Sequence, residues 1–168
     1  MARTRIIVVA TTAGLLAALA GLTAPAHAGT GATAGVNAAT ARAASTSGSC
    51  SNKGAFINFN AYYHNSSRYH VFTSFDWSIG GSGVRNKNNV ELRVKHHNTA
   101  GHDTIHWTWI SLDNTRKGYS KLTSANDYRP VPKGGVKVAK NKKAYVEFKA
   151  VFDKKGTDPR CGSHTQNI

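Results

Sequence analysis

Acidic residues are scarce in this sequence, with 8 Asp and Glu against 22 Lys and Arg, so the chain has a formal net charge of +14 at pH 7. A charge of this size bears on partners and solubility rather than on fold. It suits an anionic partner such as nucleic acid, a phosphate-containing wall polymer, acidic lipid or an acidic protein. It equally suits a self-repelling surface that keeps a protein monomeric. The basic residues are scattered, and only Lys133 to Lys143 approach a cluster.

Cysteines are limited to Cys50 and Cys161, and the absence of a C-x-x-C motif argues against a redox or zinc-ribbon role. Two cysteines in an exported chain predict one disulfide. Closing a loop of about 112 residues is worth about 4 to 5 kcal/mol in the chain-entropy model. The bond would tie the beginning of the patterned sequence to its end.

Long apolar runs are absent except near the N-terminus, where Arg3 and Arg5 precede the weakly apolar stretch Ile6–Leu22 and the A-x-A site Ala26–Ala28. This pattern predicts a signal peptide over residues 1–28 and a secreted, extracellular protein with no transmembrane segment after cleavage. The Ala-rich leader resembles those of bacteria with GC-rich genomes. The mature chain then has 20 basic and 8 acidic residues, a net charge of +12.

Bulky apolar residues are also missing from residues 29–49, which contain almost only Gly, Ala, Thr, Ser, Val and Asn. We expect a flexible arm here, because the segment has too little apolar surface to offset the entropy cost of ordering. It is either a spacer left by export or an arm that adds as a strand to a groove of a partner. The folded domain is predicted over residues 50–161, with a C-terminal tail over residues 162–168.

Helical periodicity is absent, and apolar residues alternate with polar ones over Phe56–Tyr63, Tyr69–Ile79, Val136–Ala139 and Ala144–Phe152. Short strands at roughly ten-residue intervals predict an all-β fold. We expect an antiparallel β-sandwich of immunoglobulin-like architecture, a single domain closed by one disulfide, with a small barrel as the alternative. In Tyr69–Ile79, strict alternation places Val71, Thr73 and Phe75 on one face. A turn at Lys140–Lys142 is expected to pair Val136–Ala139 with the strand that follows.

The stretch Val90–Trp109 predicts a β-hairpin with the four-residue loop Asn98–Gly101. One face then pairs apolar residues: Val94 with Ile105, Leu92 with Trp107, and Val90 with Trp109. The other face pairs Lys95 with Thr104, Arg93 with His106, and Glu91 with Thr108. Because a slip by one residue would move every apolar side chain to the solvent face, the pattern predicts this register. Trp77, Trp107 and Trp109 are accordingly expected in the core.

Four histidines, at positions 96, 97, 102 and 106, suggest a metal site, but their spacing does not favour one. His106 lies four strand residues from His102, which is about 13 Å. His96 points to the opposite face, where Asp103 is expected to hydrogen-bond it, and Arg93 and Lys95 make the site basic. We therefore expect no metal and no cofactor.

Catalytic signatures are missing, since the sequence has no G-x-S-x-G, no H-E-x-x-H and no phosphate loop. The one acid–base group worth naming is Glu91, Arg93 and His106, with His97 or His102, on the outer face of the hairpin. A secreted ribonuclease uses these residue types as base, phosphate ligand and acid. We expect no enzyme, and a small secreted nuclease-type toxin is the alternative.

Because catalytic and metal-binding signals are missing, we predict the function from the charge and exposed edges of the fold. We expect a secreted, non-enzymatic binding or adaptor protein that acts through its arm, its strand edges or its basic surface. Its partner is an extracellular protein or an anionic cell-surface polymer, and no specific nucleic-acid motif is present. A cationic antimicrobial protein is a further alternative. The candidate surface residues are Arg93, Lys95, His97, His102, His106, Lys133, Lys137, Lys140, Lys142 and Lys143.

The disulfide prediction is tested by intact mass. The secreted protein should incorporate no alkylating reagent before reduction and two equivalents after it, because both thiols are expected to be paired. Alkylation of both cysteines without prior reduction would refute the pairing.

Overall fold

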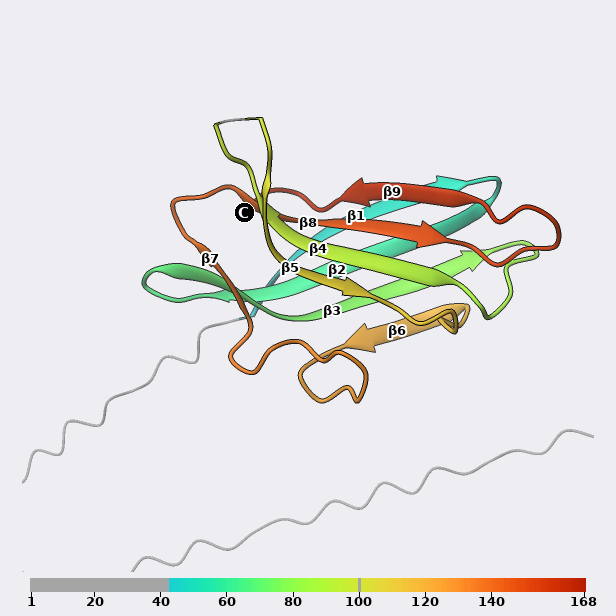
Figure 1. Cartoon of the computed structure of the whole chain (residues 1–168), viewed down its shortest axis with the longest axis horizontal. Coiled ribbons are helices and arrows are strands. Elements are labelled where there is room, and N and C mark those ends of the chain that lie inside the picture. The colour runs from blue at the N-terminus through green and yellow to red at the C-terminus, as the bar shows by residue number, and fades with distance from the viewer. Residues whose placement is uncertain (1–42, 100) are drawn as a thin grey trace, which may run out of the picture. The chain divides into compact units, whose positions relative to one another are not determined.

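The computed structural model describes residues 43–99 and 101–168, which form nine β-strands and no helix (Figure 1). The strands are β1 (Ala44–Asn52), β2 (Ala55–Asn65), β3 (Tyr69–Gly81), β4 (Asn89–His96), β5 (Thr104–Ile110), β6 (Gly118–Leu122), β7 (Val136–Ala139), β8 (Ala144–Val151) and β9 (Arg160–His164). The predicted signal peptide and residues 29–42 of the predicted arm lie outside the described residues. Within that described part, no helix is long and apolar enough to cross a membrane.

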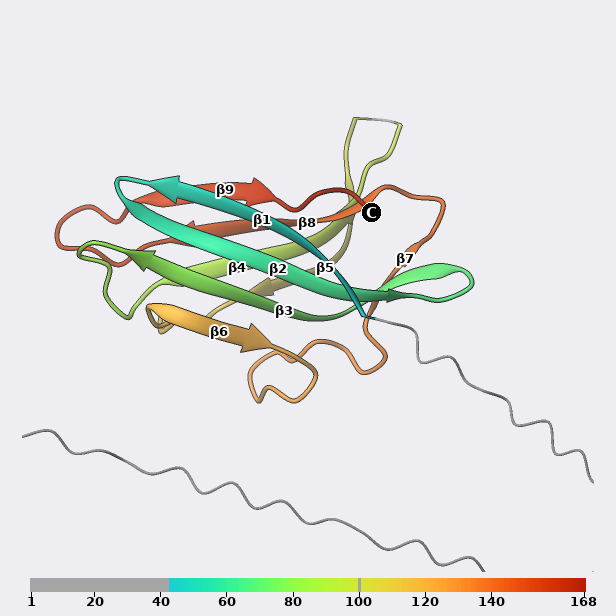
Figure 2. The ribbon, with the colours of Figure 1, turned by 180° about the vertical axis from the view of Figure 1, so that it is seen from behind.

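The strands form two antiparallel sheets (Figures 1 and 2). The first has the order β1-β2-β3-β6, and β7 also pairs with β3; the second has the order β5-β4-β8-β9. On its edge away from β2, the long strand β3 pairs with two strands: with β7 along Tyr69–Phe72 and with β6 along Phe75–Ile79. The all-β prediction is confirmed. The order places β3 directly beside β2, whereas immunoglobulin domains place a later strand there.

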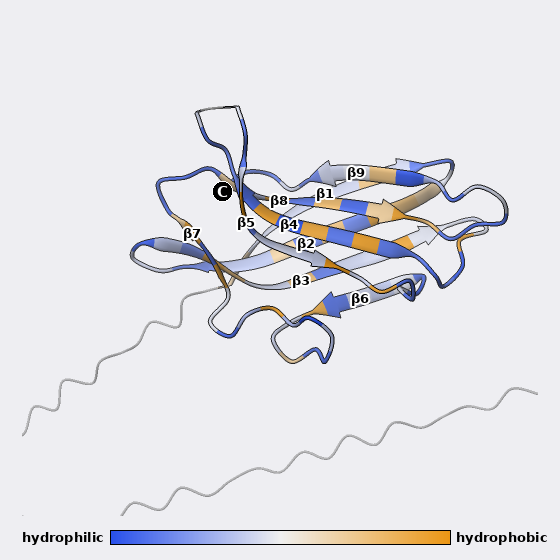
Figure 3. Ribbon diagram, in the orientation of Figure 1, coloured by the Kyte–Doolittle hydropathy of each residue, from blue (hydrophilic) through white to orange (hydrophobic). Residues whose placement is uncertain are grey.

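The core lies between the two sheets and follows from strict alternation in the strands. Along β4, Val90, Leu92 and Val94 are buried, while the intervening side chains are partly exposed, and Figure 3 shows the alternating hydropathy of this strand. Phe59 of β2 stacks on Phe148 of β8, with ring centroids 4.9 Å apart. Burial of such side chains is the main favourable term in folding.

One side of the two sheets is closed by a seam between β1 and β9, which lie along each other in both views (Figures 1 and 2). The predicted disulfide is confirmed here, because Cys50 of β1 bonds Cys161 of β9. The Thr46 hydroxyl donates to the carbonyl of Gln166 at 2.8 Å, which adds a polar link across the same seam. A Cβ at Gly48 would lie 2.6 Å from the His164 carbonyl oxygen, so glycine permits this close approach.

The predicted arm and tail boundaries are wrong where the structure describes them. Residues 44–49 belong to β1, whose backbone pairs with β2 and whose Thr46 is buried. Residues 162–168 continue the second sheet: Thr165 is fully buried, and Ile168 exchanges backbone hydrogen bonds with Ala144 at 2.9 and 3.1 Å. Small residues order here because neighbouring strands supply backbone hydrogen bonds, which composition does not reveal.

A β-bulge between β2 and β3 changes which side chains of β3 face inward. Tyr62 pairs with Ser74 and Tyr63 pairs with Phe72, so Thr73 is an extra residue. Thr73 is exposed and Phe72 is completely buried, which reverses the prediction for Thr73. An inserted residue shifts the alternation by one position, and a prediction based on strict alternation does not detect this shift.

The predicted register of the β4–β5 hairpin is also wrong, because the partners of Glu91–Val94 are shifted by two residues along β5. Leu92 pairs with Trp109 and Val94 with Trp107, and a bulge then leaves His106 unpaired before Ile105. A shift of two residues keeps each strand face intact, so Trp109 is buried and Trp107 partly buried as predicted. Beyond the bulge, Ile105 faces solvent.

The expected hairpin between Val136–Ala139 and the following strand does not form. β7 pairs with β3 in the first sheet, whereas β8 pairs with β4 and β9 in the second. Residues 140–143 therefore connect the two sheets at one end of the fold.

The bulge in β3 predicts unequal effects of two neighbouring substitutions. Phe72→Ala should destabilise the protein by about 3 to 5 kcal/mol, because it removes a fully buried ring. Thr73→Ala, its matched control, should change stability by less than about 1 kcal/mol. Urea denaturation measures both, and a larger effect at Thr73 would contradict the bulge.

Candidate functional site

A groove with a volume of about 350 Å³ lies where β5 of the second sheet meets β7 of the first. Its lining combines basic, aromatic and backbone groups: His106, Trp107, Pro132, Lys133, Gly135, Val136 and Lys137. Three of the predicted surface residues, His106, Lys133 and Lys137, come together here from segments far apart in the sequence. The groove is on the side opposite the disulfide-closed seam.

β7 and the turn before it position the two lysines. Val136 and Val138 point into the core, so the intervening Lys137 points outward. The turn places Lys133 beside the groove, and the Gly135 N–H donates to the Pro132 carbonyl at 2.9 Å. Gly135 has a φ of 77°, and a Cβ there would lie 2.6 Å from the Phe72 carbonyl oxygen, so this position requires glycine.

Trp107 forms the aromatic wall of the groove. Its ring stacks on the buried Phe75 with centroids 5.4 Å apart, and the side chain remains partly exposed. A ring held on one side by the core and open on the other offers a rigid surface for a ligand. Trp107 therefore serves both the core and the groove.

His106 is paired with a second histidine. Its Nε2 lies 2.7 Å from Nδ1 of the buried His96, so one ring donates and the other accepts in this hydrogen bond. The His106 side chain is exposed, but partial desolvation by its neighbours lowers its pKa, and the nearby His96 ring lowers it further. The predicted hydrogen bond between Asp103 and His96 does not form, because His96 pairs with His106 and Asp103 pairs with His97 and Tyr145.

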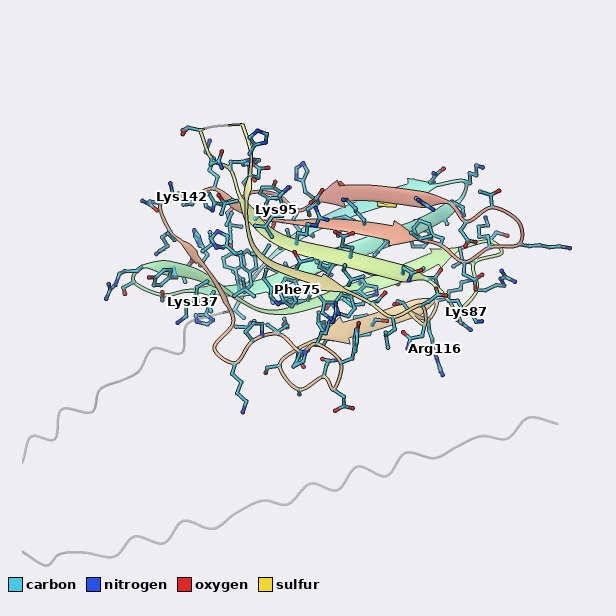
Figure 4. The ribbon with its side chains drawn as sticks, viewed as in Figure 1. Phe75, Lys87, Lys95, Arg116, Lys137 and Lys142 are labelled. Carbon is cyan, nitrogen blue, oxygen red and sulfur yellow. A yellow bond between two sulfur atoms is a disulfide. The ribbon has the colours of Figure 1, made fainter. Side chains whose placement is uncertain are left out.

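The groove continues into a basic surface. The chain between Tyr128 and Tyr145 has six basic residues and no carboxylate: Arg129, Lys133, Lys137, Lys140, Lys142 and Lys143. In the described part of the chain, none of these six makes a salt bridge, and all five lysines are exposed. Figure 4 places Lys137 and Lys142 at one end of the fold and Lys87 and Arg116 at the other. We call the groove together with these six residues the basic edge.

The predicted surface residues Arg93 and Lys95 lie elsewhere, on the outer face of the second sheet, and both are paired with carboxylates. Arg93 Nη2 lies 2.5 Å from Glu91 Oε1, and Lys95 Nζ lies 3.4 Å from Glu147 Oε2. Lys149 approaches the same Glu147 at 3.9 Å. This face is a network of alternating charges, and its cations are not free for an anionic ligand.

His97 and His102 lie at the loop end of the hairpin, between β4 and β5. His97 Nδ1 is 3.0 Å from Asp103 Oδ1, and the His97 ring stacks on Tyr145 with centroids 4.6 Å apart. The Tyr145 hydroxyl donates to Asp103, which lowers the pKa of that carboxyl, and His97 acts in the same direction. His102 is exposed in the loop. His97 is therefore held in a surface network, separate from the groove.

The acid–base group considered for a nuclease is not assembled. Glu91 pairs with Arg93 and lies opposite Ile110, four strand residues from His106, or about 13 Å along the sheet. His106 hydrogen-bonds His96 instead. Within residues 43–99 and 101–168, no group of three or more His, Cys, Asp or Glu is placed to hold a metal ion.

Sequence reasoning missed His96, Trp107 and Gly135 as parts of the site. Spacing alone carried no signal for the bulge that joins His96 to His106. Gly134 and Gly135 together gave a signal for a turn, but not for its position beside β5.

Comparison of the chain with protein-family models, with curated proteins and with solved structures found no match.

The histidine pair predicts a pH dependence of stability. Because folding lowers the pKa of His106 below its ordinary value of about 6.5, the unfolded chain binds more protons as the pH falls. The contribution of His106 to the free energy of unfolding is thus complete above about pH 6.5, and it is lost as the pH falls through the lowered pKa. His106→Gln should flatten the decline in unfolding free energy between about pH 7.5 and pH 5.

Burial also lowers the pKa of His70, so a residual decline is expected in that variant. His102→Gln is the control, because that side chain lies in the hairpin loop, outside the His96–His106 hydrogen bond. Urea denaturation at several pH values measures the effect. Equal pH dependence in wild type and His106→Gln would contradict the assignment.

Proposed function

We propose that this protein is a non-enzymatic binding protein that holds an anionic polymer on its basic edge. The observation that carries the proposal is the groove between β5 and β7, where Lys133 and Lys137 flank His106 and Trp107. Two unpaired ammonium groups attract an anionic group, and a partly exposed indole ring packs against the attached sugar or chain. The outer network of the second sheet lacks such free cations.

The distribution of charge supports an extended ligand. Six basic residues without an intervening carboxylate run from the groove to the loop that connects the sheets. Surface lysines at this spacing contact a chain of repeated anions better than a single small ion, because each contact is weak and the contacts add. His106 adds to this: its protonation at lower pH would bring a further positive charge to the groove.

Export to the extracellular space remains part of the proposal. The leader pattern of residues 1–28 supports it, and the Cys50–Cys161 disulfide is in keeping with an oxidising compartment. Anionic polymers of cell surfaces are then the available partners. The adaptor hypothesis based on residues 29–42 depends on a segment outside the described residues.

We further infer that the two sheets form a β-sandwich, immunoglobulin-like in its layers though not in its strand order. Inward side chains of both sheets belong to one core cluster, and the supporting contact is the stacking of Phe59 on Phe148. A sandwich of this kind leaves its strand edges and outer faces for binding, which agrees with the location of the groove.

The function is tested by binding to immobilised polyphosphate. The mature protein should bind with an affinity that falls as NaCl rises, because salt screens the contacts. The double variant Lys133→Gln/Lys137→Gln should weaken binding by about tenfold, since each lost contact is worth roughly 0.7 kcal/mol. Trp107→Leu should also weaken it.

The control removes the same charge from the opposite end of the fold, as Lys87→Gln/Arg116→Gln (Figure 4). This variant should bind nearly as well as wild type. Equal weakening in both double variants would show that net charge alone governs binding and would overturn the assignment to the basic edge. Absence of binding at low salt would overturn the proposal itself.

A further inference from the structure

The outer face of the first sheet is the side of β1, β2, β3 and β6 that points away from the core, and this sheet lies toward the viewer in Figure 2. Alternate residues of these strands form it. We call this surface the serine–asparagine face. It consists of the odd positions of Ser45–Ser51, the even positions of Phe56–Tyr62 and Ser74–Gly80, and Tyr119 with Lys121.

The serine–asparagine face is almost uncharged, although the chain is strongly basic. Its charged residues are Asp76 and Lys121, which offset each other, and most of its other side chains are hydroxyls and amides. Such a face does not attract an anionic polymer. It also includes no aliphatic side chain among these described positions, so it lacks the apolar centre that protein–protein interfaces use. A ligand without charge and with many hydrogen-bonding groups suits it better.

Two tyrosine rings lie along this face and do not stand away from it. Tyr119 is paired with Ser78, yet its hydroxyl donates to Oδ2 of Asp76, two residues away along β3, at 3.1 Å. Tyr62 is paired with Ser74, and its hydroxyl donates to the same oxygen from the other direction at 2.8 Å. Both rings must extend over the sheet to reach Asp76.

Phe56 adds a third ring to the same face. It is paired with Gly80 of β3, where a Cβ would overlap the Phe56 ring, so glycine permits this ring to lie on the sheet. Phe56 is 39% exposed and Tyr119 67%. A ring that lies along a sheet presents its face to solvent, and the apolar face of a sugar ring packs against such a surface.

Asp76 fixes the polar groups of the face. Its carboxylate is 5% exposed and accepts hydrogen bonds from Asn60, Tyr62 and Tyr119. In the described part of the chain it makes no salt bridge, and burial of an unpaired carboxylate opposes folding. Its three bonds hold one amide and two phenols in fixed orientations, as a binding site requires. Each phenol oxygen keeps lone pairs that accept from a ligand hydroxyl.

A shallow hollow with a volume of about 330 Å³ adjoins these groups. Ser47, Ser49, Asn58 and Asn60 line it with hydroxyls and amides. These groups both donate and accept hydrogen bonds, as the hydroxyls of a sugar do. Ser47, Asn60 and Asp76 lie in one row across the sheet, so a ligand that crosses from β1 to β6 meets the hollow and the rings within about 14 Å.

We propose that the serine–asparagine face binds an uncharged polysaccharide, a chain of neutral hexose rings joined by β-1,4 links. Such chains are extended and flat, so their ring faces stack on aromatic side chains while their hydroxyls reach amides and hydroxyls beside them. The face lacks the aliphatic neighbour that the methyl groups of N-acetylated sugars require. The site is separate from the basic edge, and the proposal is independent of the function assigned to that edge.

The experiment measures depletion of the mature, disulfide-bonded protein by acid-swollen cellulose in about 0.5 M NaCl, where charge contacts are screened. Wild type should bind. Phe56→Ala and Tyr119→Ala should each weaken binding by about tenfold, because each removes a stacking ring. Tyr128→Ala is the matched control and should bind as wild type does, since it removes an exposed ring from the loop between β6 and β7.

A second variant, Asn58→Lys, guards against misfolding of the alanine variants. It extends a longer side chain over the hollow from an exposed position, so it should weaken binding with an unchanged circular dichroism spectrum and thermal midpoint. Phe56→Ala and Tyr119→Ala should still bind polyphosphate, which separates this site from the basic edge.

Three results would overturn the proposal. The first is a wild type that cellulose does not deplete at either low or high salt. The second is wild-type binding by folded Phe56→Ala and Tyr119→Ala, because the contact would then lie on another face. The third is binding to acid-swollen chitin as strong as that to cellulose, which would contradict the choice of unsubstituted hexose chains.

Discussion

The closure of the β1–β9 seam is the constraint on which the rest of the structure depends. The Cys50–Cys161 bond and the Thr46 hydrogen bond hold the edges of the two sheets together on that side. The opposite side has no such link in the described chain, and there β5 and β7 are left as neighbours across a groove. The groups of the proposed binding site therefore collect where the sheets are not closed.

Charge is separated on the molecule in a way that the net value of +14 conceals. The outer face of the second sheet pairs its cations with Glu91, Glu147 and Asp103, which are three of the eight carboxylates of the chain. The basic edge has none. The anionic polymer that we propose as ligand would meet exposed lysines at this one place.

Two bulges determine which side chains are available. The one in β3 buries Phe72 and so supports the Gly135 turn that carries Lys133. The one in β5 brings His106 to His96 and turns Ile105 outward. Bulges near strand edges often change the direction of side chains, and both bulges here change which side chains face the proposed binding surface.

The sequence by itself determined the strands β2 to β5, β7 and β8, the faces of the tryptophans and the disulfide. Alternation within a strand and the number of cysteines can be seen without knowing which strands pair. Only the tertiary structure decided the hairpin register, the order of residues 44–49 and 162–168, and the pairing of β7 with β3. It also decided that His106, Lys133 and Lys137 share one groove. Strand partners and bulges depend on packing between distant segments, and an alternating pattern is compatible with several such arrangements.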